Sequence, residues 1–417
     1  MNHHLPDPNL TANQIHEANP LRACIAVPPV VDFYFTRHRF SGLCSEILTN
    51  FLKENRYEVQ LFNFPLQKKK GSQLPLPKVL DYLKPHIIEN ETGSVSFFTR
   101  YQRFGPMLDQ CADQIIAFLP DIVLISCFAF CYADPALDLA SQIRAINPEI
   151  AIAIGGAGVS AYPDFFIGNP NIDFTLTGEA EVSVPPFLKS LEHNSKDFSK
   201  VSNLYHKNNG EIIAPLIIKQ TEADEIAFVL KKTHATPKAL YYSTSLSRGC
   251  PKKCRFCSNF LCHGREFRII PIKKIKQGLS ELFMNPEDSD KTIYVNFEDD
   301  NLLLAPEYFL DVLKIFKEKF SRIFFLAENG VDYTKLTPEL VKELIALGMQ
   351  QFNLSIASTH LPILAEEQRD ATFPLYEKVL QILETHQIQS ITYFICGFKK
   401  DSKKTVAANI AYLAKLP

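Results

Sequence analysis

The sequence lacks an excess of charge of either sign and lacks a long hydrophobic run. Its 44 Lys and Arg residues nearly balance 46 Asp and Glu residues, so the formal net charge is −2. This balance leaves no electrostatic footprint for nucleic acid or an anionic membrane. No apolar stretch approaches the length of a membrane span, and the opening Met-Asn-His-His-Leu-Pro lacks the basic and apolar regions of a signal peptide. We therefore expect a cytoplasmic protein with no nucleic-acid partner and no membrane span.

Most of the ten cysteines stand alone along the chain, largely in apolar runs. Cysteines of this kind are usually small buried hydrophobic residues. Scattered free thiols are consistent with a reducing compartment such as the cytoplasm. The isolated cysteines are Cys24, Cys44, Cys111, Cys127, Cys131, Cys262 and Cys396.

The other three cysteines, Cys250, Cys254 and Cys257, share the run Ser-Arg-Gly-Cys-Pro-Lys-Lys-Cys-Arg-Phe-Cys. Three thiolates this close together can hold three irons of a [4Fe-4S] cluster, which leaves the fourth iron open to a small molecule. Zinc is the competing interpretation, because Cys262 or His263 could supply a fourth ligand and close a tetrahedral structural site. The run alone does not decide between them.

The carboxy-terminal half alternates strand-like and helical patterns, which predicts parallel strands joined by crossover helices. With 417 residues and 46% hydrophobic content, the chain is long enough for two cored domains. In a barrel of such units the active site lies just past the strands, and the three-cysteine run follows the first of them. The predicted strands are 241–246, 293–297, 323–327, 352–356 and 391–396, and the predicted helices are 272–284, 306–320, 338–347, 375–386 and 405–416.

The CxxxCxxC spacing, the aromatic Phe256 before the last cysteine and the apolar run that leads in from Tyr241 resemble the radical S-adenosylmethionine (SAM) superfamily. The resemblance implies a [4Fe-4S] cluster held by Cys250, Cys254 and Cys257. It also implies that SAM binds the open iron and is cleaved to a 5′-deoxyadenosyl radical, with the electron supplied by a reductant such as flavodoxin or ferredoxin.

The resemblance also implies that residues just past the barrel strands contact SAM or the substrate. Acids after the second strand would accept hydrogen bonds from the SAM ammonium group, serines after the fourth would bond its ribose or carboxylate, and a glycine after the last would let the backbone approach the adenine. A solvated loop with a helix cap is the alternative for the acids. The candidates are Phe256, Glu298, Asp299, Asp300, Glu328, Ser355, Ser358 and Gly397.

The amino-terminal half predicts a doubly wound, Rossmann-like α/β sheet, in which ligands bind at the carboxyl ends of the strands. The predicted strands are 22–27, 58–62, 122–127, 150–154 and 172–176, and the clearest helices are 42–54, 106–118 and 135–146. Two glycine-containing sites follow strands, and such glycines permit tight turns and close approach of a flat ligand. The candidate residues there are Ser126, Gly155, Gly156, Gly178, Glu179 and Glu181.

A sheet with these glycines, followed by a three-cysteine barrel, resembles the cobalamin-binding domain of B12-dependent radical SAM enzymes. The resemblance implies bound cobalamin, with Ser126 facing the edge of the corrin. A degenerate domain that keeps the fold without the ligand is the alternative. The Asp-x-His-x-x-Gly motif of many B12 proteins is absent, and its nearest echo places His38 without an orienting aspartate. We therefore expect cobalt to have no histidine ligand.

The predicted organisation is a tail at 1–20, a cobalamin-binding-like domain at 21–187 with an insertion at 63–105, a linker with a hairpin at 188–239, and a radical SAM domain at 240–417. The resembled barrel is a (β/α)6, TIM-like structure. Only five of its units can be counted, so we expect a partial barrel that stops before its sixth strand and leaves a sheet edge exposed.

The expected function is that of a cobalamin-dependent radical SAM enzyme, which the resemblance most often links to methyl transfer to an unactivated centre. One alternative is cyclisation or oxidation without methyl transfer. Another is a non-catalytic iron–sulfur protein in which Cys262 completes the cluster. A methylthiotransferase is disfavoured, because the amino-terminal cysteines are not grouped. The organic substrate is not identified by the sequence.

Overall fold

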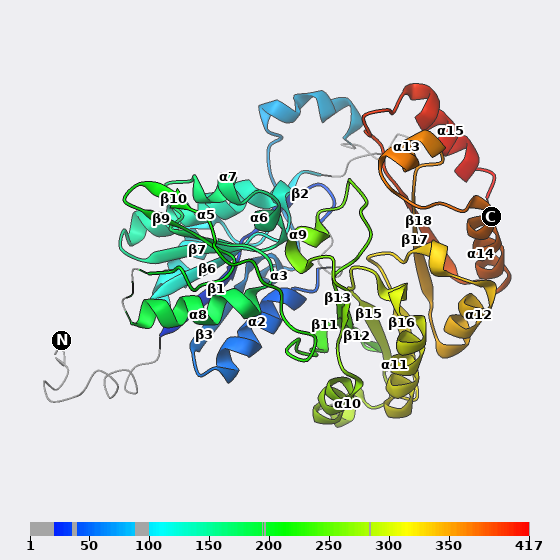
Figure 1. Ribbon diagram of the computed structural model, residues 1–417, viewed down its shortest axis with the longest axis horizontal. Coiled ribbons are helices and arrows are strands. Elements are labelled where there is room, and N and C mark those ends of the chain that lie inside the picture. The colour runs from blue at the N-terminus through cyan, green and yellow to red at the C-terminus, as the bar shows by residue number, and fades with distance from the viewer. Residues whose placement is uncertain are drawn as a thin grey trace, which may run out of the picture. The chain divides into compact units, whose positions relative to one another are not determined.

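The computed structural model describes residues 21–35, 40–87, 100–193, 195, 197–282 and 285–416. The predicted tail at 1–20 and the candidate His38 lie outside these ranges. The chain divides into two compact units, Met1–Gln220 and Thr221–Pro417 (Figure 1).

A seven-stranded sheet forms the centre of the first unit. Its strands are β1 (Arg22–Val27), β3 (Glu58–Asn63), β6 (Ile122–Ser126), β7 (Ala151–Gly155), β8 (Phe174–Leu176), β9 (Leu204–Asn208) and β10 (Glu211–Ile213). They lie in the order β10-β9-β8-β7-β6-β1-β3. The strands from β3 to β8 in this order run parallel, whereas β9 and β10 form an antiparallel edge. The order reverses between β1 and β6, as in a doubly wound sheet, so the predicted fold class and its five strands are confirmed.

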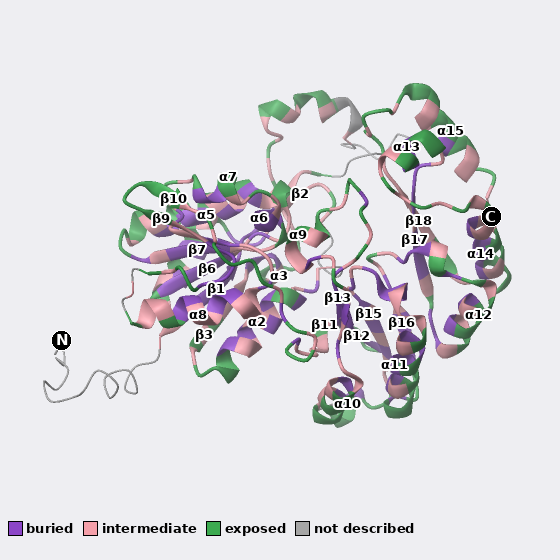
Figure 2. Cartoon of the chain, in the orientation of Figure 1, coloured by how far each residue is buried: buried purple, intermediate pink, exposed green. Residues whose placement is uncertain are grey.

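Helices cover both faces of this sheet because its central strands are apolar on both sides. The helices are α2 (Leu43–Glu54), α4 (Leu108–Ala117), α5 (Ala133–Ile146) and α8 (Ala180–Glu192). Ala23 and Ile25 of β1 pack in the core under α2 and α8, whereas Cys24 and Ala26 pack in the core under α4 and α5. The alternation of side chains along a strand thus places successive residues of β1 in different cores, and Figure 2 shows β1, β6 and β7 as buried.

The insertion predicted at 63–105 has short elements of its own. These are α3 (Phe64–Gln67), β4 (Ser72–Gln73), the 3-10 helix η2 (Lys78–His86) and β5 (Gln102–Phe104). With β2 (Val30–Asp32), the two strands form a small antiparallel sheet in the order β2-β5-β4. Residues 88–99 lie outside the described part of the insertion.

The range predicted as a linker, 188–239, supplies strands to both units. Strands β9 and β10 extend the first sheet, and the turn between them contains Asn209 and Gly210, both with positive φ. Beyond Gln220 the chain enters the second unit, where β11 (Lys231–Ala235) pairs antiparallel with β12 (Ala239–Thr244). The connection is therefore largely built into the two sheets.

Five parallel strands form the described part of a partial barrel in the second unit. After β12 come β15 (Thr292–Phe297), β16 (Ile323–Leu326), β17 (Gln351–Ala357) and β18 (Gln389–Phe394). Strands β12, β15 and β16 pair in parallel, as do β17 and β18, and two parallel bridges link the groups through Phe325–Met349 and Val331–Leu354. The five predicted strands of this half are confirmed.

Amphipathic helices cover one face of these strands. They are α10 (Ile272–Glu281), α11 (Pro306–Lys319), α12 (Pro338–Leu347) and α14 (Phe373–Thr385), while α15 (Lys403–Leu413) follows β18. Their buried side chains form one core with alternate residues of the strands, such as Ile293 and Val295 of β15. Among the described helices, none has the length and apolar character needed to cross a membrane.

Candidate functional site

The three-cysteine loop begins at a glycine that no other residue can replace without strain. Strands β13 (Ser247–Arg248) and β14 (Arg268–Ile269) pair antiparallel and close the base of the loop. Gly249 then adopts a φ of +84°, and a Cβ at this position would overlap the backbone oxygen of Glu266. The glycine therefore lets the two arms of the loop pass close to each other.

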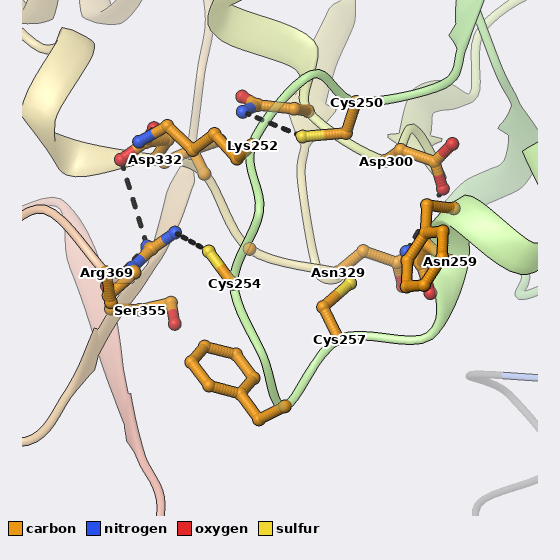
Figure 3. A pocket seen from close by; sticks show the side chains of 15 residues that line it. Cys250, Lys252, Cys254, Cys257, Asn259, Asp300, Asn329, Asp332, Ser355 and Arg369 are labelled. Atoms are coloured by element: carbon orange, nitrogen blue, oxygen red, sulfur yellow. Dashed lines mark hydrogen bonds and ion pairs between the residues drawn. The ribbon is translucent and has the colours of Figure 1, made fainter. Parts of the chain in front are cut away.

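Cys250, Cys254 and Cys257 line one pocket, with their side chains around the same space (Figure 3). Ligands of a single zinc ion lie about 3.8 Å apart, because Zn–S bonds are about 2.3 Å long, whereas a cubane cluster takes each thiolate on a different iron. Within the described ranges, no group of three His, Cys, Asp or Glu could hold one metal ion. Cys262 is not among the residues that line the pocket. Three thiols spread around a pocket fit a cluster of several irons.

Asp300 lines the same pocket and holds the loop in place. Its Oδ2 accepts hydrogen bonds from the Gly249 amide and from Nδ1 of His263, each at 2.8 Å, and its Oδ1 accepts one from Asn259 at 3.1 Å. Burial by itself would raise the pKa of Asp300, but the bond to His263 and its charge hold that pKa below the usual range. The main contacts of Asp300 are therefore hydrogen bonds that hold the cysteine loop in place.

His263 belongs to the same contact. Burial tends to lower its pKa, but Asp300 and Cys262 raise the pKa well above its usual value. Its Nδ1 contacts Asp300, and His263 is not among the residues that line the pocket. The geometry therefore gives His263 a structural role at the end of α9 (Asn259–His263).

Asp299, a candidate SAM ligand, is turned toward the backbone before the loop. It is 6% exposed, accepts two hydrogen bonds from the Leu246 amide at 3.0 and 3.2 Å, and accepts one from Ser247 Oγ at 2.5 Å. Burial raises the pKa of Asp299 to about 7, against the effect of these bonds. Neither Asp299 nor Glu298 is among the residues that line the pocket.

Two buried side chains donate N–H groups to the cysteine sulfurs. Asn301 Nδ2 lies 3.7 Å from Cys250 Sγ, and Arg369 Nη1 lies 4.0 Å from Cys254 Sγ (Figure 3). The Oδ1 of Asn301 and the Nε of Arg369 are buried and have no hydrogen-bond partner among the residues that the structure describes. Both side chains line the pocket, so two sulfurs each face a fixed donor.

Asp332 anchors the two cations of the pocket. It is 5% exposed and forms ion pairs with Lys252 and, at 3.8 Å, with Arg369. Its Oδ1 also accepts hydrogen bonds from the amide of Thr334 at 3.3 Å and from its hydroxyl at 2.8 Å. Burial alone would raise the pKa of Asp332, but Lys252 and Arg369 lower it. The carboxylate stays charged and orients both partners.

The remaining barrel candidates divide between the pocket and its surroundings. Phe256 and Ser355 line the pocket. Glu328 does not line it: its backbone oxygen accepts from Asn353 and Tyr393, and its neighbour Asn329 lines the pocket instead. Ser358 and Gly397 do not line the pocket either. Ser358 Oγ accepts a hydrogen bond from the amide of His360 at 3.1 Å, and the amide of Gly397 donates to Asp401 at 2.8 Å. Gly397 has a φ of +99°, and a Cβ at this position would meet no atom within 4 Å.

Sequence reasoning missed several pocket residues. Asn301 could have been found, since it extends the acidic run after β15, and Lys252 lies inside the cysteine motif. Asp332 and Arg369 carry no such signal, because Asp332 follows an irregular segment and Arg369 lies in a turn between two helices. The missed residues are Lys252, Asn259, Asn301, Asp332 and Arg369.

In the first unit the candidates after β6 and β7 lie side by side. Ser126 pairs in register with Gly155, and both are half-buried. Gly156 has a φ of +117°, and a Cβ there would lie 2.6 Å from the Cys127 oxygen. These small residues let the loops after β6 and β7 pack closely at the carboxyl end of the sheet, which is where doubly wound sheets bind their ligands.

The candidates after β8 form the entry to α8. Gly178 has a φ of +67°, and its amide donates to Ser160 Oγ at 2.9 Å. Glu179 is 3% exposed and precedes the first turn of α8, where Glu181 is half-buried. Gly178 therefore sets the turn at the carboxyl end of the sheet, next to the loop after β7.

Two family models match the chain in the order that the two units follow. The B12 binding domain matches residues 99–188, and the radical SAM superfamily matches residues 244–413. The chain combines a B12 binding domain with a radical SAM domain. The match to the radical SAM superfamily begins at the last residue of β12 and includes the three cysteines and the four strands β15, β16, β17 and β18. The B12 binding match includes β6, β7 and β8 with their glycine turns.

Curated proteins resemble parts of this chain. It is 26% identical to the bacteriochlorophyllide d C-12(1)-methyltransferase of Chlorobaculum tepidum over 192 residues, which are 45% of this chain and 41% of that protein. It is 22% identical to the anaerobic magnesium-protoporphyrin IX monomethyl ester cyclase of Synechocystis sp. over 306 residues, 71% of this chain and 60% of that protein. The chain thus spans about half the length of these relatives.

A solved structure has the same fold. It is the radical SAM methyltransferase TsrM from Kitasatospora setae with cobalamin and a [4Fe-4S] cluster bound. The TM-score is 0.65 at 12% sequence identity, and the match covers 95% of this chain and 70% of that one. At this identity the likeness supports the fold.

Proposed function

We propose that the chain is a cobalamin-dependent radical SAM enzyme that transfers a methyl group to an unactivated centre. The observation that carries the proposal is the pocket in which Cys250, Cys254 and Cys257 face a common space while Asn301 and Arg369 donate toward two of the sulfurs. N–H donors at the sulfurs are part of how proteins hold and tune iron–sulfur clusters.

Each part of this loop has a task in such a site. Asp300 ties the amide of Gly249 to α9 and so fixes the start of the cysteine run. The amide of Arg255 donates to the oxygen of Glu367 at 3.0 Å, which fixes the middle of the run on the turn after α13 (Leu361–Glu366). When bound, a [4Fe-4S] cluster would supply the electron that cleaves SAM to a 5′-deoxyadenosyl radical. The chain's own residues position the thiolates around the pocket.

The candidate SAM contacts that remain in this proposal are those that line the pocket. Ser355 offers a hydroxyl, Phe256 an aromatic face, and Asp300 a carboxylate whose Oδ1 is bonded to Asn259 alone among the described contacts. Asn329 joins them in place of Glu328. A reductant such as flavodoxin or ferredoxin, an organic substrate and a cytoplasmic location complete the proposal.

Cobalamin binding rests on the first unit. The B12 binding match spans β6 to α8, and Ser126, Gly155 and Gly156 lie at the carboxyl ends of neighbouring strands. We place the corrin edge there, and we keep the proposal that cobalt has no histidine ligand. Electron paramagnetic resonance of the cob(II)alamin form tests this last point: nitrogen splitting that disappears in His38→Ala would contradict it.

The test of cofactor content is anaerobic reconstitution with iron, sulfide and hydroxocobalamin. We expect iron–sulfur absorbance and one cobalamin per chain, and we expect the triple variant Cys250→Ala/Cys254→Ala/Cys257→Ala to lose the cluster absorbance and keep cobalamin. The matched control is Cys262→Ala, on the same loop but outside the pocket lining, which should keep the cluster and its SAM binding. Loss of SAM binding or of the cluster in Cys262→Ala would favour a closed four-cysteine site.

Cyclisation without methyl transfer is the second candidate, because one curated relative is named as a cyclase. Incubation of the reconstituted protein with SAM labelled in its methyl group separates the two. Label in the organic product indicates methyl transfer, whereas 5′-deoxyadenosine without label in the product indicates cyclisation or oxidation.

A further inference from the structure

Arg369 is nine-tenths buried, and its guanidinium points at a cluster ligand. Its side chain is 10% exposed, Nη1 lies 4.0 Å from Cys254 Sγ, and Nη2 donates to the oxygen of Ser355 at 2.9 Å. The Nε is buried and finds no hydrogen-bond partner within the described ranges of the chain. The guanidinium therefore brings a full positive charge and an N–H donor to one sulfur, inside the pocket (Figure 3).

The turn that carries Arg369 is fixed at both ends. Before it, the oxygen of Glu367 accepts from the amide of Arg255 at 3.0 Å, within the cysteine run. After it, the amide of Thr372 donates to the hydroxyl of the fully buried Tyr333 at 3.0 Å. The position of the guanidinium is thus set by the backbone around it, and the turn is hydrogen-bonded to the cysteine run.

Asp332 sets the charge balance beside the sulfur. Its buried carboxylate pairs with Lys252 and with Arg369, whose side chains are 15% and 10% exposed, so two cations face one buried anion. Asp370, which also approaches Lys252, is 77% exposed and is screened by water. Asp332 therefore faces two cations with a single charge, and Arg369 holds its positive charge next to Cys254.

We propose that Arg369 is a positioning residue that raises the reduction potential of the cluster, by donating to Cys254 and by holding positive charge beside it, with Asp332 limiting that effect. The inference rests on the proposed function, since it requires the cluster. Reduction adds one negative charge to a cluster, and both nearby positive charge and N–H···S bonds stabilise the added electron. The neutral variant should therefore be harder to reduce.

The test is a redox titration of the reconstituted protein without SAM, with dithionite as the electron donor and the paramagnetic signal of the reduced cluster as the readout. We expect the midpoint potential of Arg369→Met to shift to more negative values and that of Asp332→Asn to shift to less negative values. Arg369→Lys, which keeps the charge and loses the planar fork, should lie between wild type and Arg369→Met.

The matched control is Lys253→Met, because Lys253 precedes Cys254 on the same loop but is exposed. It changes the net charge by the same amount, and its potential should equal that of wild type. Equal shifts in Lys253→Met and Arg369→Met would overturn the proposal, since the effect would then be one of net charge alone. Unchanged potentials in both Arg369→Met and Asp332→Asn would also overturn it, even if SAM affinity fell.

The outcomes separate this inference from the proposed function. If the wild-type chain assembles no cluster, the proposed function fails and this inference falls with it. If wild type holds a cluster and the variants share its potential, the inference alone fails. If Arg369→Met loses its cluster, the direction of the shift in Asp332→Asn decides, with a less negative potential supporting the proposal and any other result contradicting it.

Discussion

Replacement of Gly249 by alanine should destabilise the second unit far more than replacement of Gly397. Both glycines have left-handed φ values, +84° and +99°. Alanine in this conformation costs roughly 1–2 kcal/mol, and that is the whole expected cost at Gly397, where the added carbon meets no atom within 4 Å. At Gly249 the added carbon overlaps the Glu266 oxygen, so the backbone must move.

The movement at Gly249 has a further cost, because its amide donates to the charged carboxylate of Asp300 at 2.8 Å. A hydrogen bond to a charged group contributes about 1.5–3 kcal/mol, so the two terms together give roughly 2.5–5 kcal/mol for Gly249→Ala. The predicted difference between the variants is therefore about 1.5–3 kcal/mol, in favour of Gly397→Ala.

The assay is urea unfolding of the cofactor-free protein followed by circular dichroism, because the chain contains no tryptophan for fluorescence. Iron per chain after reconstitution is the second measurement, and it should fall in Gly249→Ala only. Equal unfolding free energies for the two alanine variants would refute the reasoning, since the close approach of the two loop arms at Gly249 would then add nothing to the cost of the substitution.

Two further predictions concern the ion pair at α9 and the glycine turn after β7. His263→Gln should lower the free energy of unfolding most between about pH 4 and 6.5. Because the pKa of His263 is raised in the folded protein, its contribution to stability is complete below its usual pKa of 6.5 and is lost as the pH rises through its folded pKa. Because the pKa of Asp300 is lowered, its contribution is lost as the pH falls below its usual pKa of 3.8. Thermal unfolding from pH 4 to 9 checks this, and a cost that grows with pH would contradict it. Gly156→Ala, whose Cβ would lie 2.6 Å from the Cys127 oxygen, should lower bound cobalt per chain much more than Gly155→Ala, whose nearest contact is 3.3 Å; equal cobalt in both would show that the turn is not needed.

The strands were predictable from the sequence because they are short apolar runs with clear ends. β1 occupies the predicted residues 22–27, and β15 begins one residue before the predicted run at 293–297. Strands buried on both faces need no alternation, so a continuous apolar run is a sufficient signal. The ends of β8 were less clear: the strand is Phe174–Leu176, shorter than the predicted 172–176, and the preceding Asp173 still donates its amide to the Ile152 oxygen of β7 at 3.0 Å.

The acidic run after β15 shows where position in the sequence stops being informative. Glu298, Asp299 and Asp300 were all placed toward SAM because they follow a strand, but successive side chains leave a strand end in different directions. Asp299 turns to the amides before the cysteine loop, whereas Asp300 and the next residue, Asn301, line the pocket. The side chains of the adjacent residues Asp299 and Asp300 thus point in different directions, so one is structural and the other lines the pocket. The sequence does not show which of the two has which role.

Arg369 is a pocket residue that no local pattern in the sequence could have indicated. It contacts a cysteine 115 residues earlier in the chain, through a turn whose own sequence, Glu-Glu-Gln-Arg-Asp, is typical of a solvated helix end. Its burial depends on two backbone contacts, to the cysteine run and to Tyr333, that exist only once the barrel strands have formed. The three cysteines can be recognised in the sequence because the spacing of their motif is local. Residues that tune such a motif reach it across the fold, and a buried charge is recognisable as such only after its partner Asp332 and the sulfur that it faces have been located in space.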